Sequence, residues 1–230
     1  MTAMVRITGG MVSRMVMPLS DLIKSISYDQ DELLQWIIRL YVEGGRFDVD
    51  PTFSTGGFYR KIPQPKLCYD LVPQKENVLQ ADCRKLPIKS GSVRSIIIDP
   101  PFLATTGKSL SCETGNIINR RFSVCRSERE LAALYEAAIR EANRVLCPGG
   151  VLVFKCQDKV SSGRQHMMHC SVYQWAIAQG FEALDLFILL ARSRLVANWQ
   201  RNQKHARKYH SYFWVFRKGK GVVPECGKST

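Results

Sequence analysis

The sequence predicts an α/β protein with a mostly parallel sheet and helices on both faces, and three observations support this class. Apolar strand-like runs alternate with amphipathic helical runs, which is typical of a doubly wound sheet. The run Ile96, Ile97 and Ile98 is entirely β-branched, as expected of a strand that is covered on both faces. Several predicted strands end on an aspartate, at the end of an open parallel sheet where ligands bind.

The N-terminal half predicts one helix and then a series of short strands. Residues 29–43 have apolar residues at helical spacing, acids in the first turn and two glycines after the last turn. The loop at 53–66 contains too many prolines for a long helix. Strands are expected over 46–51, 66–72, 77–82 and 93–101. The second and third are separated by far fewer than the dozen or so residues of a parallel crossover, so the sequence leaves open whether both are strands.

The C-terminal half predicts two helices and three further strands. Ser127 and Glu130 have the spacing of a capping box, and the helix that follows has an apolar face reaching Val145. Residues 103–126 show no periodicity and predict a long functional loop. The remaining elements are expected at 151–156 (strand), 169–180 (helix), 182–191 (strand) and 209–217 (strand). We expect a leader at 1–24, a single domain at 25–218 and a tail at 219–230.

The composition predicts a partner of opposite charge. The chain has 33 Lys and Arg against 20 Asp and Glu, a net charge of +13, and nucleic acid is the commonest partner of so basic a protein. A membrane is not expected, because no apolar run approaches the roughly 18 residues of a spanning helix. The eight cysteines are scattered without a CxxC pair, which favours a reducing cytoplasm. His166, His169 and Cys170 cluster without further ligands, so no metal is predicted.

Two motifs follow predicted strands, DPTFSTGG at 50–57 and DPPF at 99–102. The first is neither the GxGxxG dinucleotide fingerprint nor a phosphate loop, and no basic residue interrupts it, so it suits a nucleoside without phosphates. Asp70 follows Asp50 by 20 residues, about the offset at which an acid meets a ribose. Asp99, followed by Pro100 and Pro101, ends its strand with a stiffened backbone.

The order of these motifs resembles that of the nucleic-acid amino-methyltransferases, which methylate exocyclic nitrogens of adenine or cytosine in DNA. In that family a DPFxGxGT-type motif holds S-adenosylmethionine, and a later [DNS]PP[YFW] motif performs the chemistry. Ser54 stands here where the first glycine is expected, and Gly57 where a threonine is common. The resemblance spans roughly residues 45–216 and implies a Rossmann-like class I methyltransferase fold.

The resemblance also implies site residues. The catalytic residues would be Asp99, Pro100, Pro101 and Phe102. The residues that bind S-adenosylmethionine would be Asp50, Pro51, Thr52, Phe53, Ser54, Gly56, Asp70, Asp82 and Cys83. Of these, Asp82 looks like the acid that contacts the adenine of the cofactor.

Amino methylation explains why such residues are needed. An exocyclic amino group is a poor nucleophile because its lone pair is delocalised into the ring. If the Asp99 carboxylate and the Pro100 carbonyl accept its hydrogens, the nitrogen becomes pyramidal, and Asp99 stabilises the positive charge that develops. Phe102 offers a flat face for an extruded base. The alternative is that the motif is only a turn, since Asp and Pro also serve turn geometry.

The segment from Arg192 to Lys220 contains nine Lys or Arg and no acid, with aromatic residues interleaved. Phosphate contacts combined with stacking suit a flipped or single-stranded nucleic acid, although such a run also suits a solvated face. Together with the loop after DPPF, it supplies the predicted nucleic-acid-binding residues Arg120, Arg121, Arg194, Trp199, Arg201, Lys204, His205, Arg207 and Lys208.

The leading hypothesis is therefore S-adenosylmethionine-dependent methylation of a DNA base, with adenine N6 ahead of cytosine N4. Methylation of guanine N2 in RNA is the enzymatic alternative, because enzymes of that kind also use DPP[FY]. A nucleic-acid-binding module of the same fold without catalysis is the other alternative.

Overall fold

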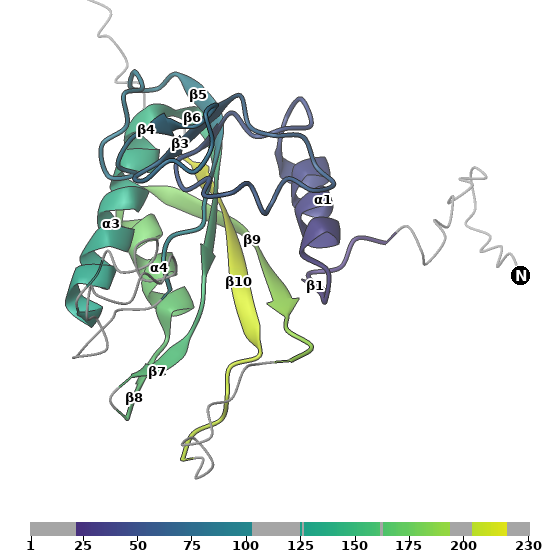
Figure 1. The fold of residues 1–230 in the computed structure, drawn as a ribbon, viewed down its shortest axis with the longest axis vertical. Coiled ribbons are helices and arrows are strands. Elements are labelled where there is room, and N and C mark those ends of the chain that lie inside the picture. Colours follow the sequence, from purple (N-terminus) through teal and green to yellow (C-terminus); the bar gives the residue numbers. More distant parts are fainter. Residues whose placement is uncertain (1–21, 103–124, 126, 162, 194–203, 220–230) are drawn as a thin grey trace, which may run out of the picture.

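The computed structural model describes residues 22–102, 125, 127–161, 163–193 and 204–219 (Figure 1). The strands of the central sheet are β1 (Ile26–Ser27), β2 (Val49–Asp50), β3 (Leu67–Asp70), β4 (Leu79–Gln80), β5 (Val93–Ile98), β6 (Leu146–Cys156), β9 (Phe181–Leu190) and β10 (His210–Lys218). Their order across the sheet is β1-β9-β10-β6-β5-β2-β3-β4. All neighbours run parallel except β10, which lies antiparallel between β6 and β9.

Helices cover both faces of this sheet, as predicted. Helix α1 (Gln30–Tyr41) lies on one side, and α3 (Glu128–Val145) and α4 (Met168–Ala178) lie on the other (Figure 1). Ser127 caps α3, since its hydroxyl accepts the backbone N–H of Glu130 at 3.1 Å, which confirms the predicted cap. The mostly parallel sheet with helices on both faces confirms the predicted Rossmann-like α/β fold.

The isoleucines of β5 show why this strand lies in the middle of the molecule. Ile96 and Ile98 pack in the cluster under α3 and α4, whereas Ile97 packs in the cluster under α1. All three side chains are fully buried, and burial of each contributes about 1.5–3 kcal/mol. A slip of one residue would exchange the two faces, so the register of this strand is strongly specified.

The uncertain pair of strands, β3 and β4, is present and parallel. Tyr69 pairs with Leu79 and Asp70 with Gln80, although residues 71–78 connect them without a helix. The short connection suffices because β4 has only two residues and lies at the edge of the sheet. The connection at 51–66 also contains no helix, as its prolines predict.

The structure adds features that the sequence patterns do not predict. Strand β6 begins at Leu146, before the expected 151, because residues 147–150 form an irregularity where its register with β5 shifts. A hairpin of β7 (Lys159–Ser161) and β8 (Arg164–His166) extends beyond β6.

The predicted loop 103–126 lies outside the described residues apart from Cys125, as do most of the leader and the tail. None of the described helices is long and apolar enough to cross a membrane.

Candidate active site

The two motifs meet at the centre of the sheet. Strands β2 and β5 are neighbours; the chain continues from β2 to β3 and β4 on one side, and from β5 to β6 on the other. This is the topological switch point of the sheet, where ligands of open α/β proteins bind. Asp50 ends β2 and Asp99 directly follows β5, so the fold places both predicted carboxylates there.

A single side chain, Thr52, connects the two motifs. Its hydroxyl donates to Asp50 Oδ1 at 3.0 Å and accepts the backbone N–H of Asp99 at 2.8 Å. Its own backbone N–H also donates to Asp50 Oδ1, at 2.8 Å. The 50–57 loop and the start of DPPF are therefore held together by one hydroxyl group.

Asp50 is deeply buried and organises the loop that follows it. The residue is only 2% exposed, and its Oδ2 accepts a hydrogen bond from the hydroxyl of Tyr59 at 2.6 Å. Burial raises the pKa of Asp50 to about 7, although the hydrogen bonds from Tyr59 and Thr52 favour the charged form. Both carboxylate oxygens are thus occupied by groups of the loop itself.

The loop has a shape that depends on left-handed backbone positions. Ser54 has φ +54° and Gly56 has φ +75°, so both residues adopt the left-handed conformation that favours glycine. A Cβ on Gly56 would lie 2.8 Å from the ring of Phe53. That ring is buried and stacks on Tyr59 with centroids 5.2 Å apart. Pro51 is also buried, so the loop packs closely against the sheet.

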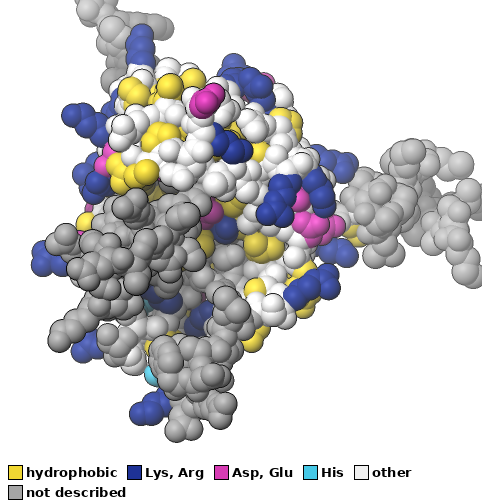
Figure 2. Space-filling view, viewed as in Figure 1, with side chains coloured by type: hydrophobic (Ala, Val, Ile, Leu, Met, Phe, Trp, Pro, Cys, Tyr) yellow, Lys and Arg dark blue, Asp and Glu magenta, His cyan; other side chains and the backbone are white. Residues whose placement is uncertain are grey.

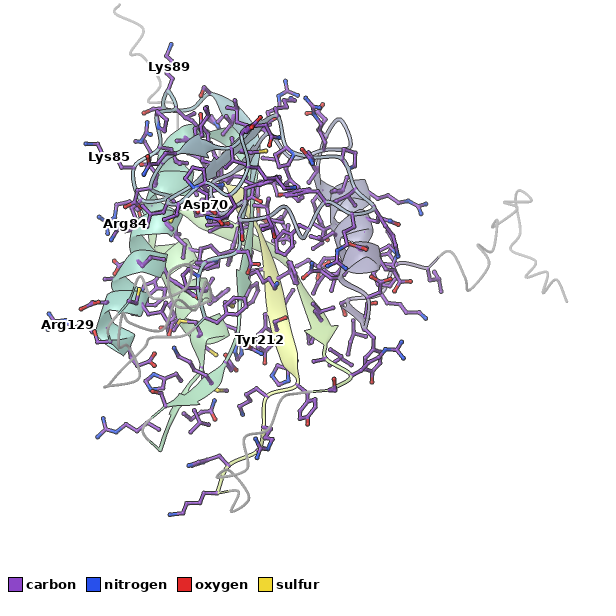
Figure 3. The ribbon with its side chains drawn as sticks, in the orientation of Figure 1. Asp70, Arg84, Lys85, Lys89, Arg129 and Tyr212 are labelled. Carbon is purple, nitrogen blue, oxygen red and sulfur yellow. The ribbon has the colours of Figure 1, made fainter. Side chains whose placement is uncertain are left out.

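Asp70, the predicted ribose acid, also holds this loop. Its Oδ2 accepts the backbone N–H of Ser54 at 2.7 Å, and its Oδ1 accepts that of Val72 at 2.9 Å. Figure 3 labels Asp70 at the same end of the molecule as Arg84, whose guanidinium points away from the sheet.

The predicted adenine-contacting acid, Asp82, forms an ion pair with Arg84. The atoms Asp82 Oδ2 and Arg84 Nη2 are 2.6 Å apart, and this hydrogen bond lowers the pKa of Asp82. The neighbouring Cys83 is half-buried against the core, and burial raises the pKa of its thiol to about 12. Asp82 therefore stays ionised, and the Cys83 thiol stays neutral.

Among the described residues, only one of the two carboxylate oxygens of Asp99 has a partner. Its Oδ2 lies 3.3 Å from the Nζ of Lys155. Its Oδ1 is buried and has no hydrogen-bond partner among the described residues. Burial raises the pKa of Asp99, and the Lys155 ammonium opposes that rise. A buried acceptor without a donor is costly unless a ligand supplies one.

Lys155 belongs to the candidate site, although the sequence patterns did not point to it. It is 8% exposed, and its ammonium contacts Gln30 Oε1 at 3.1 Å in addition to Asp99. Aromatic rings surround it, with centroids 4.7 Å away for Phe58, 5.3 Å for Phe213 and 5.5 Å for Phe102. The available signal was a lysine inside the apolar run VLVFKC, since a charge in a buried strand requires partners.

The rest of DPPF is anchored through its carbonyl groups. The hydroxyl of Tyr135 on α3 donates to the Pro101 carbonyl at 2.8 Å. Lys159 on β7 donates to the Phe102 carbonyl at 2.9 Å and forms an ion pair with Glu128 at 2.8 Å. Pro100 is buried, whereas Phe102 is half-buried, so the motif presents its aromatic ring at the edge of the site.

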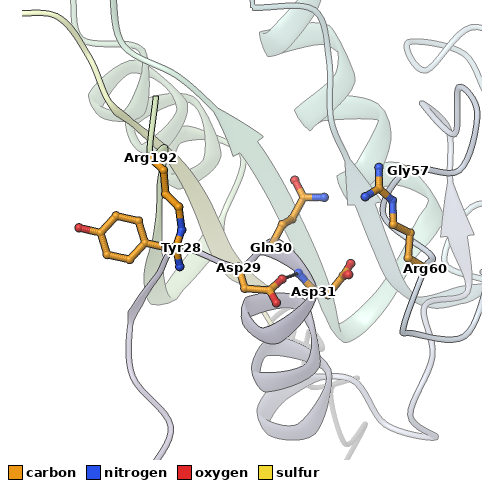
Figure 4. A pocket seen from close by; sticks show the side chains of 7 residues that line it. All are labelled: Tyr28, Asp29, Gln30, Asp31, Gly57, Arg60 and Arg192. Carbon is orange, nitrogen blue, oxygen red and sulfur yellow. Dashed lines mark hydrogen bonds between the residues drawn. The ribbon is translucent and has the colours of Figure 1, made fainter. Parts of the chain in front are cut away.

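A pocket of about 420 Å³ opens beside this arrangement (Figure 4). It lies at the start of α1 and is lined by Tyr28, Asp29, Gln30, Asp31, Gly57, Arg60 and Arg192. Gln30 links the pocket to Asp99 through Lys155. Acidic and guanidinium side chains line the same space, so the pocket suits a ligand that carries both charges.

Only part of the predicted nucleic-acid surface can be placed. Lys204 and His205 are exposed, and Arg207 and Lys208 are half-buried, in the segment that leads into β10. Arg120, Arg121, Arg194, Trp199 and Arg201 lie outside the described residues. On the face shown in Figure 2, Lys and Arg side chains are spread around the molecule rather than gathered in one patch.

No family model and no curated protein sequence matches the chain. Solved structures do resemble it. One is a Thermus thermophilus protein provisionally named a DNA modification methylase, in complex with S-adenosyl-L-methionine (19% identity, TM-score 0.42, 61% of this chain and 52% of that one). Another is the PvuII DNA methyltransferase, which is cytosine-N4-specific (17% identity, TM-score 0.44, 62% and 49%).

A third similar structure is the [4+2]-cyclase SpnF, with 18% identity and a TM-score of 0.49 over 83% of this chain and 81% of that one. The chain thus spans about half the length of the two methylases it resembles. At these identities and scores the similarities carry no conclusion about activity, and the assignment of the fold rests on the architecture of the sheet.

The burial of Asp50 predicts an unusual dependence of stability on pH. Because its pKa is about 7 in the folded state and near 4 when unfolded, the folded protein keeps a proton that the unfolded chain has lost. The free energy of unfolding should therefore fall as pH rises from about 4 to about 7, by up to about 1.4 kcal/mol per pH unit from this group. Asp50→Asn should remove this contribution, as measured by urea denaturation between pH 4.5 and 8.

Asp82→Asn provides the control, because the pKa of Asp82 is lowered and its titration affects stability only at more acidic pH. That variant should keep the slope of the parent protein between pH 5 and 7. Parallel profiles for the parent and Asp50→Asn would show that Asp50 does not hold a proton in the folded state.

Proposed function

We propose that this protein transfers the methyl group of S-adenosylmethionine to an exocyclic amino group of a nucleic-acid base, with adenine N6 in DNA as the first candidate. The observation that carries the proposal is Asp99 Oδ1, a buried acceptor at the sheet's switch point without a donor among the described residues. An amino group attached to a ring supplies the N–H donor that this oxygen lacks.

The loop and its surroundings fit the cofactor. Gly56 has a left-handed φ of +75°, and a Cβ there would clash with the Phe53 ring, so glycine lets the loop keep this shape at the switch point of the sheet. Asp70 ends β3, Asp82 follows the neighbouring β4, and both carboxylates have acceptor capacity left for hydroxyl and amino groups of a nucleoside. The pocket with Arg60, Arg192, Asp29 and Asp31 would suit the carboxylate and ammonium of the amino-acid end. When bound, the cofactor supplies a methyl group already activated by its sulfonium.

The role of Asp99 and Pro100 is to prepare the amino nitrogen. Asp99 Oδ1 and the Pro100 carbonyl would each accept one of its hydrogens, which draws the lone pair out of the ring. Positive charge then grows on the nitrogen, and the carboxylate stabilises it in a site with little water. Thr52 bonds the N–H of Asp99, and Tyr135 bonds the carbonyl of Pro101. The two acceptors of the DPPF motif are therefore held in place and need little reorganisation.

Lys155 sets the charge on Asp99. Its ammonium, 3.3 Å from Oδ2, favours the ionised carboxylate against the effect of burial and leaves Oδ1 available for the substrate. Phe102 is held over the same ammonium, with 5.5 Å between Nζ and the ring centroid. An extruded base that stacks on the free side of this ring would bring its amino group to Asp99.

The experiment is methylation of defined nucleic acids with isotope-labelled S-adenosylmethionine, followed by mass spectrometry of the nucleosides. We expect labelled N6-methyldeoxyadenosine from DNA. Asp99→Ala should lower its formation by at least about a hundredfold, because an oriented group that stabilises developing charge contributes about that much. Alanine is chosen because the family motif also accepts Asn and Ser at this position.

Glu136→Ala, which removes an exposed carboxylate of α3, should leave the rate unchanged. Label found only in guanine of RNA would reject DNA as the substrate. Binding of nucleic acid without label in any base would reject methyl transfer and favour the binding module.

Replacement of Lys155 tests the electrostatic part of the proposal. In Lys155→Met the favourable ammonium is lost, the pKa of Asp99 rises further, and the carboxylate is protonated at a higher pH. The acid limb of the pH–rate profile should therefore move to higher pH, with the rate at neutral pH reduced at least about tenfold and partly restored at alkaline pH.

Lys85→Met serves as the control, since this lysine points outward in Figure 3 and is exposed. A loss of rate that is equal at every pH would assign Lys155 a packing role instead and contradict this part of the account.

A further inference from the structure

A second group of reactive side chains lies away from the candidate active site, at the beginning of α4. Cys170 is exposed, and its Sγ lies 3.3 Å from Nε2 of His169. The Nδ1 of the same imidazole lies 2.8 Å from both carboxylate oxygens of Asp158. Asp158 follows β6 and is 2% exposed, so a thiol, an imidazole and a buried carboxylate are connected in a row.

The imidazole in this row is held on several sides. The ring of Tyr212 on β10, labelled in Figure 3, stacks on it with centroids 4.3 Å apart. The Nε1–H of Trp214 donates to the His169 carbonyl at 2.9 Å, and the His169 N–H donates to Asp158 Oδ1 at 3.2 Å. The carboxylate favours the tautomer with its proton on Nδ1, which leaves Nε2 as an acceptor toward the thiol.

This is the arrangement of a nucleophile, a base and a group that orients the base. The charged and titratable groups that face it are Asp158 after β6, Tyr212 on β10 and the buried Cys156 on β6. Cys170 lies in the first turn of α4, and the Asp158 carboxylate accepts the His169 N–H of the same turn.

The other described cysteines lack these features. Cys68, Cys125 and Cys156 are buried, and Cys83 and Cys147 are half-buried. Burial raises the pKa of Cys68 to about 11 and that of Cys83 to about 12, which keeps both thiols neutral. Among the described residues, Cys170 is the exposed cysteine and the one with a contact to an imidazole.

We propose that Cys170 is a covalent modification site, a nucleophilic thiol that reacts with small soft electrophiles through displacement. In the reaction the sulfur forms a bond to the electrophilic carbon, and the leaving group departs with the electron pair of the bond that breaks. The thiol proton passes to Nε2 of His169, and Asp158 stabilises the imidazolium that forms. His169 acts as the base, whereas Asp158 is a positioning residue. The site does not depend on the proposed methyl transfer.

The test is alkylation of the full chain with iodoacetamide, from which iodide is the leaving group. Peptide mass spectrometry measures the rate of alkylation at each cysteine. At pH 7, Cys170 should react at least about tenfold faster than Cys83 and Cys147 of the same molecules. His169→Gln should lower the rate at Cys170 about tenfold at pH 7. At pH 10 it should leave the rate nearly unchanged, because hydroxide then removes the thiol proton.

The comparison of the two pH values separates activation from accessibility, since a variant that only hides or exposes the thiol changes both rates. His166→Gln is the matched control: it lies on β8 in the same HMMHC run and should not alter the rate. Asp158→Asn should reproduce the pH 7 loss. Equal rates for the parent and His169→Gln at pH 7, or a loss of the same size at pH 10, would overturn the proposal.

Discussion

The candidate site depends on the hydroxyl of Thr52, which joins two strands that are distant in the sequence. It donates to the Asp50 carboxylate and accepts the Asp99 amide, so the 50–57 loop and the DPPF motif cannot move independently without breaking one of these bonds. A net contribution of about 0.5–1.5 kcal/mol for the bond from the Asp99 N–H, and more for the bond to the carboxylate, favours one relative position of the two motifs. The proposed methyl transfer requires that position, because methyl donor and acceptor must be closely aligned.

The same junction brings two carboxylates close together, the buried Asp50 and the half-buried Asp99, and their surroundings differ. Asp50 accepts three hydrogen bonds from the loop, and with a pKa of about 7 it is partly protonated at neutral pH. Asp99 has the Lys155 ammonium on one oxygen and, among the described residues, no donor on the other. Partial neutralisation of Asp50 lessens its repulsion of Asp99, which favours the ionised form of the Asp99 carboxylate.

Much of the fold could be predicted from local patterns. The isoleucines of β5 and the cap at Ser127 act over a few residues, and both elements form where the sequence predicts them. The meeting of Asp50 and Asp99 also followed, because the carboxyl ends of parallel strands share one edge. The switch of strand order between them could not be obtained from periodicity, since it depends on which strands pair.

The features that escaped prediction depend on such long-range pairing. Lys155 matters because β6 lies beside β5, which places its ammonium against Asp99. Ser54 has a left-handed backbone conformation that a serine does not predict, and only the comparison with the DPFxGxGT-type motif indicated a glycine-like position there. Asp158 and His169 are eleven residues apart and meet because the hairpin of β7 and β8 returns the chain to the end of β6.

The most direct test of this account is the affinity for S-adenosylmethionine, measured by calorimetry together with the rate of methyl transfer, in Thr52→Val and Thr52→Ser. Serine keeps the hydroxyl that joins the motifs, whereas valine has nearly the shape of threonine and lacks it. The account predicts that valine weakens both cofactor binding and transfer by about tenfold or more and that serine changes neither by more than a few-fold. Equal behaviour of the two variants would show that the two motifs do not depend on this hydroxyl and would contradict the account.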